Sequence, residues 1–156
     1  QRAEEIGLGE YEVLTLASVV EKETGADSER ALVASVFHNR LKLRMRLDSD
    51  PTVIYGLKNF NGNLTRKHLR ARTPYNTYKR YGLPPTPISN PGKASLQSVL
   101  YPAENKFLYF VARGDGSSKF SKTLREHNKA VWYFQKVRKN RQAMSRKRKQ
   151  ASSAKL

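Results

Sequence analysis

The sequence predicts an α+β fold, a mainly helical domain with a small antiparallel β-hairpin. Apolar residues recur at i, i+3 and i+4 spacing, the pattern of amphipathic helices, in residues 10–24, 28–43, 90–101 and 123–138. A single aromatic and β-branched run, residues 107–112, leads through a glycine-containing turn into a second short strand. Because strands and helices do not alternate, packed helices with one hairpin are favoured over βαβ units.

The length and composition are those of one domain with its own core. The chain has 156 residues, of which 38% are hydrophobic and 28% charged, as is typical of a globular protein with a polar surface. It has no cysteine, which excludes a disulfide framework and any Cys-based metal site or nucleophile. No apolar run approaches the ~20 residues of a membrane span. The chain opens with Gln1 rather than Met, so a targeting segment could precede it in a longer protein.

The net charge of +17 is concentrated toward the C-terminal end. Residues 136–156 contain nine Lys or Arg and no acid. This composition predicts a disordered basic tail over residues 140–156, which would attract polyanions such as nucleic acid or anionic lipid. Residues 1–9 are interpreted as a linker or a frayed start, which leaves residues 10–139 as the folded domain.

The first half of the chain contains predicted helices with recognisable ends. Gly25 closes the helix over residues 10–24. A cap at Asp27 opens the next helix, which should end near residues 43–46. Asp50-Pro51 then begins a short helix, because Asp is a good cap and Pro fits the first helical position.

The middle of the chain is predicted to be mostly loop. Thr65 caps one short helix, and residues 73–78 and 81–88 then mix prolines with tyrosines and amides. Because proline ends helices and cannot donate to a sheet ladder, these residues should form fixed surface loops. Tyrosine faces with Asn and Thr groups suit a sugar-binding cleft. Ordinary proline-rich loops pack against a core with the same residues, so both interpretations stay open at this point.

The last third predicts a helix, a hairpin and a final helix. Asn90-Pro91 starts the helix through about Tyr101. The aromatic run 107–112 reads as a buried strand, and a return strand is expected around Phe120 after the glycine turn. The final helix should direct its apolar residues inward: Leu124, Val131, Phe134 and Val137.

Glu23 stands out within the first helix. Leu16, Val19 and Val20 form one apolar stripe, and Glu23 falls in that stripe because it follows Val19 by four residues and Val20 by three. Glu21 points roughly the other way. Burying a carboxylate costs several kcal/mol unless it is paired or protonated. Glu23 is therefore either held by an arginine, or kept protonated near neutral pH as a general acid requires.

Several stretches resemble the endolytic murein transglycosylases of the MltG or YceG-like family. The resemblance runs in order and with little gapping from about Leu14 to Val137. The motifs that carry it include Val20-Glu21-Lys22-Glu23-Thr24, Phe37-His38-Asn39-Arg40, Leu47-Asp48-Ser49-Asp50-Pro51-Thr52, Tyr75-Asn76-Thr77-Tyr78, Gly82-Leu83-Pro84-Pro85 and Glu126-His127-Asn128.

The resemblance implies a lytic transglycosylase that cleaves the β-1,4 bond between MurNAc and GlcNAc in peptidoglycan, leaves 1,6-anhydroMurNAc ends and terminates nascent glycan strands. It places the family's catalytic acid on Glu23. Glu23 would protonate the glycosidic oxygen and then, as a carboxylate, take the proton of the MurNAc C6 hydroxyl as that oxygen attacks C1. No water enters, so the second carboxylate of ordinary glycosidases is not required. No metal or cofactor is expected.

The resemblance also implies a location and partners. Family members begin with a membrane-anchoring helix and a LysM-like subdomain, which this chain does not contain. The full-length protein is therefore expected at the periplasmic or extracytoplasmic face of the bacterial cytoplasmic membrane. Its expected partners are peptidoglycan strands, cell-wall synthesis enzymes and, through the basic tail, an anionic membrane surface, with no specific nucleic acid.

The resemblance further suggests residues that line the cleft. The candidate substrate-binding residues are Asn39, Arg40, Asp50, Thr52, Tyr55, Tyr75, Asn76, Thr77, Tyr78, His127 and Asn128. Three of these have other readings: Asp50 as a helix cap, Arg40 as the ion-pair partner of Glu23, and His127 as a structural histidine. The family often has a His before the Phe of the return strand, where this chain has Ser118-Lys119-Phe120.

Other functions have weaker support in the sequence. A nucleic-acid-binding domain would explain the charge, but no recognition motif accompanies it. The aminodeoxychorismate lyase activity once attached to this family would need pyridoxal phosphate on a lysine, and no phosphate cradle is visible. A non-catalytic glycan binder would have the same cleft, and the sequence does not distinguish it from an enzyme.

Overall fold

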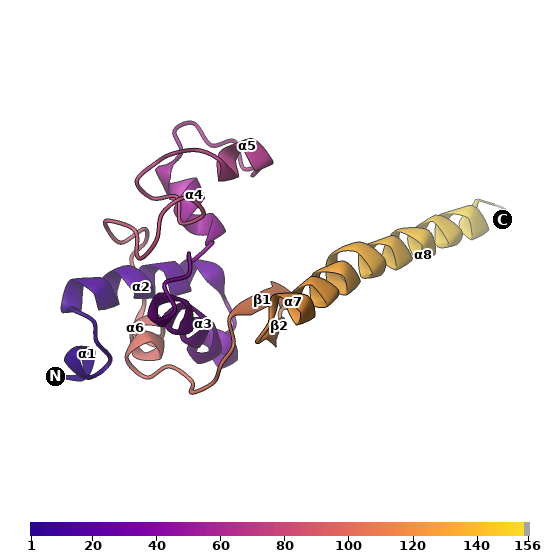
Figure 1. Cartoon of the computed structure of the whole chain (residues 1–156). Helices are drawn as coiled ribbons and strands as arrows, with labels where there is room; N and C mark the ends of the chain where they lie inside the picture. The colour runs from indigo at the N-terminus through magenta and orange to yellow at the C-terminus, as the bar shows by residue number, and fades with distance from the viewer. Residues whose placement is uncertain (155–156) are drawn as a thin grey trace. The chain divides into compact units, whose positions relative to one another are not determined.

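The computed structural model describes residues 1–154, which form two compact units that divide between Lys106 and Phe107 (Figure 1). The first unit contains α1 (Arg2–Glu5), α2 (Glu10–Glu23), a 3₁₀ turn (Asp27–Glu29), α3 (Arg30–Lys42), α4 (Asp50–Gly56), α5 (Arg66–Leu69) and α6 (Lys93–Leu100). The second contains β1 (Tyr109–Ala112), β2 (Ser118–Ser121), α7 (Leu124–Val131), a π-helical segment (Trp132–Val137) and α8 (Arg138–Ser153). The predicted α+β class is confirmed, and the single catalytic domain over residues 10–139 stays a prediction.

The core of the first unit lies where α2, α3 and α6 pack against one another. The apolar face of each helix is removed from water, which is the main favourable term in folding. The fully buried core side chains of these helices include Leu16, Val19, Val20, Val33, Phe37 and Val99. The predicted apolar stripe of α2 is thus confirmed.

Buried polar side chains connect this core to the loops around it. The backbone N–H of Ile88 donates to Ser18 Oγ at 2.9 Å, which ties the proline-rich loop to α2. His38 Nε2 lies 2.9 Å from the carbonyl of Val99, joining α3 to α6. Burial lowers the pKa of His38, so its ring is neutral at pH 7 and acts as a structural hydrogen-bonding group.

The N-terminal residues are ordered, in contrast to the predicted frayed start over residues 1–9. Arg2 Nε donates to the carbonyl of Leu100 at 2.8 Å, and its guanidinium lies over the ring of Tyr101, 4.7 Å from the centroid. These two contacts attach α1 to the end of α6. Sequence periodicity could not reveal them, because they join residues that are far apart in the chain.

Most helix boundaries agree with those predicted from the sequence, and the starts of α4 and α6 differ from the prediction. Thr65 is confirmed as the cap of α5, since its hydroxyl accepts from the backbone N–H of His68. The cap of α4 is Ser49, and Asp50 is already the first helical residue, so the predicted cap at Asp50 is wrong by one position. α6 begins at Lys93 rather than at Pro91, because Gly92 takes the extended cap conformation.

The second unit is a hairpin followed by a long helix. β1 and β2 pair antiparallel with Phe110 opposite Phe120, and the turn uses positive φ at Gly114 and Gly116, which glycine adopts without strain. α7 packs on the hairpin. Leu124 was expected to point inward but is 55% exposed, because the side of α7 that contacts the hairpin carries His127 and Ala130.

The basic C-terminal segment is helical rather than disordered. α8 extends to Ser153 and has no buried side chain, and Figure 1 shows it continuing the direction of α7. The physical reason is composition: Arg, Lys, Gln, Ala and Met are strong helix formers, and no Gly or Pro follows Gly116. Residues 155–156 of the predicted tail lie outside the described residues. Within residues 1–154, no helix combines the length and apolarity needed to cross a membrane.

Candidate active site

Glu23 is the last residue of α2, where the chain leaves the core. Val19 and Val20, one turn earlier, are fully buried, and Glu23 itself is partly buried. One oxygen of its carboxylate, Oε1, accepts a hydrogen bond from Ser49 Oγ at 2.7 Å. The helix thus presents a single carboxyl group at the edge of the core, oriented by a neighbouring hydroxyl.

The surroundings of Glu23 raise its pKa to about 7. Burial is the largest cause, since it disfavours the charged form, and the negative charge of Asp50 acts in the same direction. The Ser49 hydrogen bond and the positive charge of Arg40 oppose this rise. A carboxyl group with a pKa near the working pH can both donate and reclaim a proton, as acid–base catalysis requires.

Ser49 is held in place by two buried threonines. The backbone N–H of Ser49 donates to Thr77 Oγ1 at 2.9 Å, and Thr52 Oγ1 donates to the carbonyl of Ser49 at 2.6 Å. The two threonine hydroxyls lie 2.8 Å apart. Thr52 is 0% and Thr77 2% exposed. These side chains therefore support Ser49, and their contact with substrate stays a prediction.

Asp50 and Tyr78 form a second pair next to Ser49. The hydroxyl of Tyr78 donates to Asp50 Oδ1 at 2.7 Å, while Asp50 itself is exposed. Burial and the nearby carboxylates raise the pKa of Tyr78, so that it stays protonated and acts as a donor. The structure brings together Glu23, Asp50 and Tyr78, three of the residues predicted for the site.

Arg40 pairs with Asp48, and the predicted alternative that it holds Glu23 in an ion pair is wrong. Its Nη1 lies 3.5 Å from Asp48 Oδ2 and donates to the carbonyls of Arg46 and Leu47 at 2.9 and 3.3 Å. Arg40 is buried, so it fixes the loop that leads to Ser49. Its charge reaches Glu23 only at longer range, where it lowers the pKa.

The glutamate held by an arginine is Glu21. Its Oε2 lies 3.0 Å from Arg30 Nη1 and also accepts from the hydroxyl of Ser95 on α6. Glu21 points away from the stripe of Leu16 and Val20, as expected. On that side of α2 it meets Arg30 and Ser95 rather than open solvent. Glu21 is thus a structural residue that joins α2 to α3 and α6.

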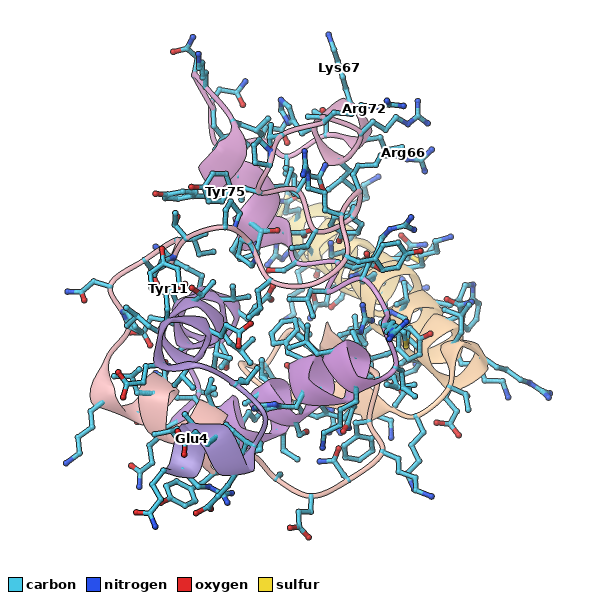
Figure 2. The ribbon with its side chains drawn as sticks, turned by 60° about the vertical axis from the view of Figure 1, so that its left-hand side comes forward. Glu4, Tyr11, Arg66, Lys67, Arg72 and Tyr75 are labelled. Atoms are coloured by element: carbon cyan, nitrogen blue, oxygen red, sulfur yellow. The ribbon has the colours of Figure 1, made fainter. Side chains whose placement is uncertain are left out.

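The tyrosines and Asn76 of the predicted cleft differ in their roles. Tyr55 and Tyr75 meet edge to face with ring centroids 4.8 Å apart, and Tyr75 bonds Thr86 at 2.8 Å between hydroxyl oxygens. Tyr55 is 50% exposed, so this pair offers an aromatic surface, and Figure 2 shows Tyr75 beside α4. Asn76 is fully buried, and its side chain donates to backbone carbonyls of the preceding turn.

The remaining predicted residues lie in other surroundings. Asn39 donates to the carbonyl of Asn105 at 3.0 Å and so fixes the end of the first unit. His127 and Asn128 belong to the second unit, where His127 stacks on Tyr109 with ring centroids 5.0 Å apart and Asn128 is exposed. Within residues 1–154, no group of three His, Asp or Glu side chains is arranged to hold a metal ion.

Comparison with known proteins identifies the family. Residues 1–132 match the model of the YceG-like family. The chain belongs to the YceG-like family. The endolytic murein transglycosylase of Bacillus subtilis is 45% identical to this YceG-like chain over 120 residues, which cover 77% of the chain and 33% of the relative. The endolytic murein transglycosylase of Streptococcus pneumoniae strain D39 is 32% identical over 126 residues, which cover 77% of the chain and 23% of the relative.

A solved structure supports the same assignment. The crystal structure of a YceG-like protein from Listeria monocytogenes has a TM-score of 0.74 and 45% sequence identity to this chain, and covers 82% of this chain and 41% of the other. The YceG-like chain thus spans about a third of the length of the Bacillus relative and about a quarter of the length of the Streptococcus relative. These comparisons do not support a nucleic-acid-binding domain.

Sequence reasoning missed one residue of the site, Ser49. It is the only hydrogen-bond donor that the described residues provide to the Glu23 carboxylate, yet a lone serine carries no periodic or charge signal. The available signal was position: Ser49 lies within the resembling motif and directly precedes Asp50-Pro51. Only the tertiary fold shows that this motif meets the end of α2.

Proposed function

We propose that this chain is the catalytic part of an endolytic murein transglycosylase, which cuts the β-1,4 bond between MurNAc and GlcNAc and leaves 1,6-anhydroMurNAc ends. The observation that carries the proposal is the single carboxyl group of Glu23, partly buried, held by Ser49 and with a pKa of about 7. The named relatives are endolytic murein transglycosylases, which supports the choice of substrate.

The reaction needs one carboxyl group in two successive roles. Protonated Glu23 gives its proton to the glycosidic oxygen, and the bond from C1 of MurNAc to that oxygen breaks. The Glu23 carboxylate then takes the proton of the C6 hydroxyl as its oxygen bonds to C1. The proton returns to Glu23, no water is consumed, and the leaving GlcNAc retains a hydroxyl at C4. A pKa near neutral keeps both proton transfers accessible.

The neighbours of Glu23 favour different protonation states of its carboxyl group, and the reaction needs both states. The Ser49 hydroxyl stabilises the carboxylate between the two proton transfers, because it donates to Oε1. Asp50 disfavours that carboxylate and so favours the protonated starting form. The aromatic pair of Tyr55 and Tyr75 provides flat apolar surface of the kind that sugar rings pack on.

The location follows from this activity as part of the same proposal. We place the full-length protein at the extracytoplasmic face of the cytoplasmic membrane, held by an N-terminal helix outside this chain, where it terminates nascent strands beside cell-wall synthesis enzymes. α8 has seven bases and no acid and exposes Met144, while Trp132 is exposed just before it. A basic helix with exposed apolar side chains suits an anionic membrane surface.

The test of the proposed function is the chemistry of the product. Digestion of uncrosslinked glycan strands should produce internal cuts with 1,6-anhydroMurNAc ends, which mass spectrometry distinguishes from hydrolysis products by the absence of an added water. Reducing MurNAc ends would contradict the mechanism. Binding of the strands without any cut would instead indicate a non-catalytic glycan-binding domain.

A further inference from the structure

The stretch that runs from the second residue of α4 through α6 carries positive charges and no negative ones. Residues 51–103 contain eight Lys or Arg and no acid. Four of these bases occur within seven residues, on α5 and the turn after it, and all four are exposed. We name these four residues the cationic arm: Arg66, Lys67, Arg70 and Arg72. Figure 2 shows Arg66, Lys67 and Arg72 extending from the same part of the first unit.

The cationic arm has no acidic partner among the described residues. The ion pairs found within residues 1–154 involve other bases, those of the N-terminus, Arg2, Arg30 and Arg40. Like charges this close together repel one another, and no ion pair within residues 1–154 compensates them. An exposed cluster of one sign raises the local concentration of ligands of the opposite sign. The arm therefore fits an anionic ligand.

The cationic arm is tied to the candidate active site through three consecutive residues. Asn76 Nδ2 donates to the carbonyls of Leu69 and Ala71 at 3.0 and 2.6 Å, which holds the backbone of the arm. Thr77 supports Ser49, the partner of Glu23. Tyr78 donates to Asp50. A ligand held by the arm would thus be held by the same buried loop that orients the catalytic carboxyl group.

The chemistry of the proposed substrate supplies anions along the same strand. Peptide stems attached to the MurNAc residues carry free carboxylates, whereas the sugar rings are neutral. Arginine and lysine bind carboxylates, and arginine can do so through two parallel hydrogen bonds. The aromatic pair of Tyr55 and Tyr75 lies on the same segment, with Tyr75 three residues after Arg72. The neutral and the charged parts of a glycan strand would each meet a matching surface.

We propose that the cationic arm binds the carboxylates of the peptide stems on the glycan strand that the enzyme cleaves. This inference rests on the proposed function and makes the site selective for strands that carry charged stems. The α8 helix also carries seven bases and no acid, and it belongs to the unit that does not contain Glu23. It therefore provides a matched control.

The experiment compares two fourfold variants on two substrates. The arm variant combines Arg66→Gln, Lys67→Gln, Arg70→Gln and Arg72→Gln. The control variant, on α8, combines Arg146→Gln, Lys147→Gln, Arg148→Gln and Lys149→Gln. Both lose four positive charges. The substrates are uncrosslinked peptide-bearing strands and the same strands with their carboxylates converted to methylamides. Circular dichroism melts check that both variants fold.

The expected result is a loss of binding confined to the arm and to charged strands. At low salt the arm variant should raise KM for the charged strands about tenfold or more, with kcat changed less than about twofold, since exposed charges act mainly on association. The difference should shrink at high salt. On methylamide strands, the wild-type protein and the arm variant should behave alike. The control variant should match the wild-type protein on both substrates.

Binding measured in a Glu23→Gln background separates this inference from the proposed function. The affinity for fluorescent strands does not depend on turnover, so the arm can be tested even if no anhydro product forms. The inference would be overturned if the proteins with the natural arm and with the fourfold arm variant bound charged strands equally well. It would also be overturned if the protein with the natural arm bound charged and methylamide strands equally well. A variant that lost binding only to phosphatidylglycerol vesicles would also overturn it, by showing a lipid headgroup site. The comparison of the two strands needs no variant and holds even if the fourfold variant misfolds.

Discussion

Glu23 and Glu21 lie two residues apart on α2 and have different surroundings. Glu23 accepts one hydrogen bond, from Ser49, at the edge of the core, whereas Glu21 is paired with Arg30 and bonded to Ser95. Helical phase predicted that the two would differ and placed Glu23 on the apolar stripe. It could not predict the partner of either residue, because Ser49 and Ser95 are brought in by tertiary packing.

Replacing Glu21 should affect stability more than catalysis. Glu21→Gln removes the charge that pairs with Arg30, whose side chain is only 14% exposed, while Glu21 is 32% exposed. An ion pair between two partly buried side chains should contribute about 1–2 kcal/mol to the free energy of unfolding. Urea unfolding should show this loss, with turnover reduced less than about tenfold. A folded but inactive variant would place Glu21 in the reaction.

The pKa of Glu23 predicts a pH-dependent stability. The folded protein binds this proton more tightly than the unfolded chain, since the pKa rises from 4.5 to about 7. The stability contribution is therefore fully present below pH 4.5 and is lost as the pH rises to about 7. Glu23→Gln should be more stable than the wild-type protein at pH 8, by up to about 3 kcal/mol, and equally stable at pH 4. Melting curves at the two pH values test this, and no difference at pH 8 would contradict the raised pKa.

Ser49 and Asp50 should shift the activity profile in opposite directions. Because the proposed reaction starts from protonated Glu23, kcat/KM should fall as the pH rises above about 7. Ser49→Ala removes a hydrogen bond that lowers the pKa of Glu23, so this fall should move to higher pH. Asp50→Asn removes a charge that raises it, so the fall should move to lower pH. Ser28→Ala, at an exposed serine, is the control. Shifts of the same sign in both variants would contradict the electrostatic account.

At the scale of elements, local signals predicted the helices better than the loops. α2, α3 and the β1–β2 hairpin follow from periodicity and turn residues. The loop of residues 73–78 was predicted as a fixed surface loop, and it forms neither helix nor strand. Two of its residues are also buried and stabilise the interior of the first unit. Asn76 is hydrogen bonded to α5, and Thr77 to Ser49. Polar residues give no periodic signal of such burial.

Asn76 should be a stability-determining residue of this loop. Asn76→Ala leaves the carbonyls of Leu69 and Ala71 without their donor and the Tyr78 N–H without its acceptor. Unsatisfied buried groups of this kind cost about 1–3 kcal/mol each, so the free energy of unfolding should fall by about 2–4 kcal/mol. Asn63→Ala, at an exposed position of the preceding loop, should leave it unchanged. Equal urea midpoints for both variants would show that Asn76 is dispensable.

At the scale of the whole molecule, the positive charge is concentrated in two stretches of the chain, for which we propose different roles. Half of the excess lies in residues 136–156, and the acid-free segment of residues 51–103 carries eight further bases. The sequence alone drew attention to the first, because the charge run is continuous. The second became visible only when the structure showed α5 and the following turn exposed and tied to the site through Asn76.

Removing residues 140–156 should separate membrane attachment from catalysis. α8 has no buried side chain, so its loss should leave the melting temperature and the turnover of soluble glycan fragments nearly unchanged. Binding to phosphatidylglycerol vesicles should weaken, mostly at low salt. The controls are the melting curve and the rate on fragments measured for the same truncated protein. A large drop in melting temperature would show that the helix packs against the rest of the protein.

The most direct test of the acid–base role of Glu23 is the rate of anhydroMurNAc formation by Glu23→Gln, measured beside Glu21→Gln. Glutamine keeps the size of Glu23 and can still meet Ser49, but it cannot give up and recover a proton. Turnover should fall by at least ~10² to 10⁴-fold in a folded protein, while Glu21→Gln should retain most of the rate. An active Glu23→Gln variant would contradict the proposed mechanism.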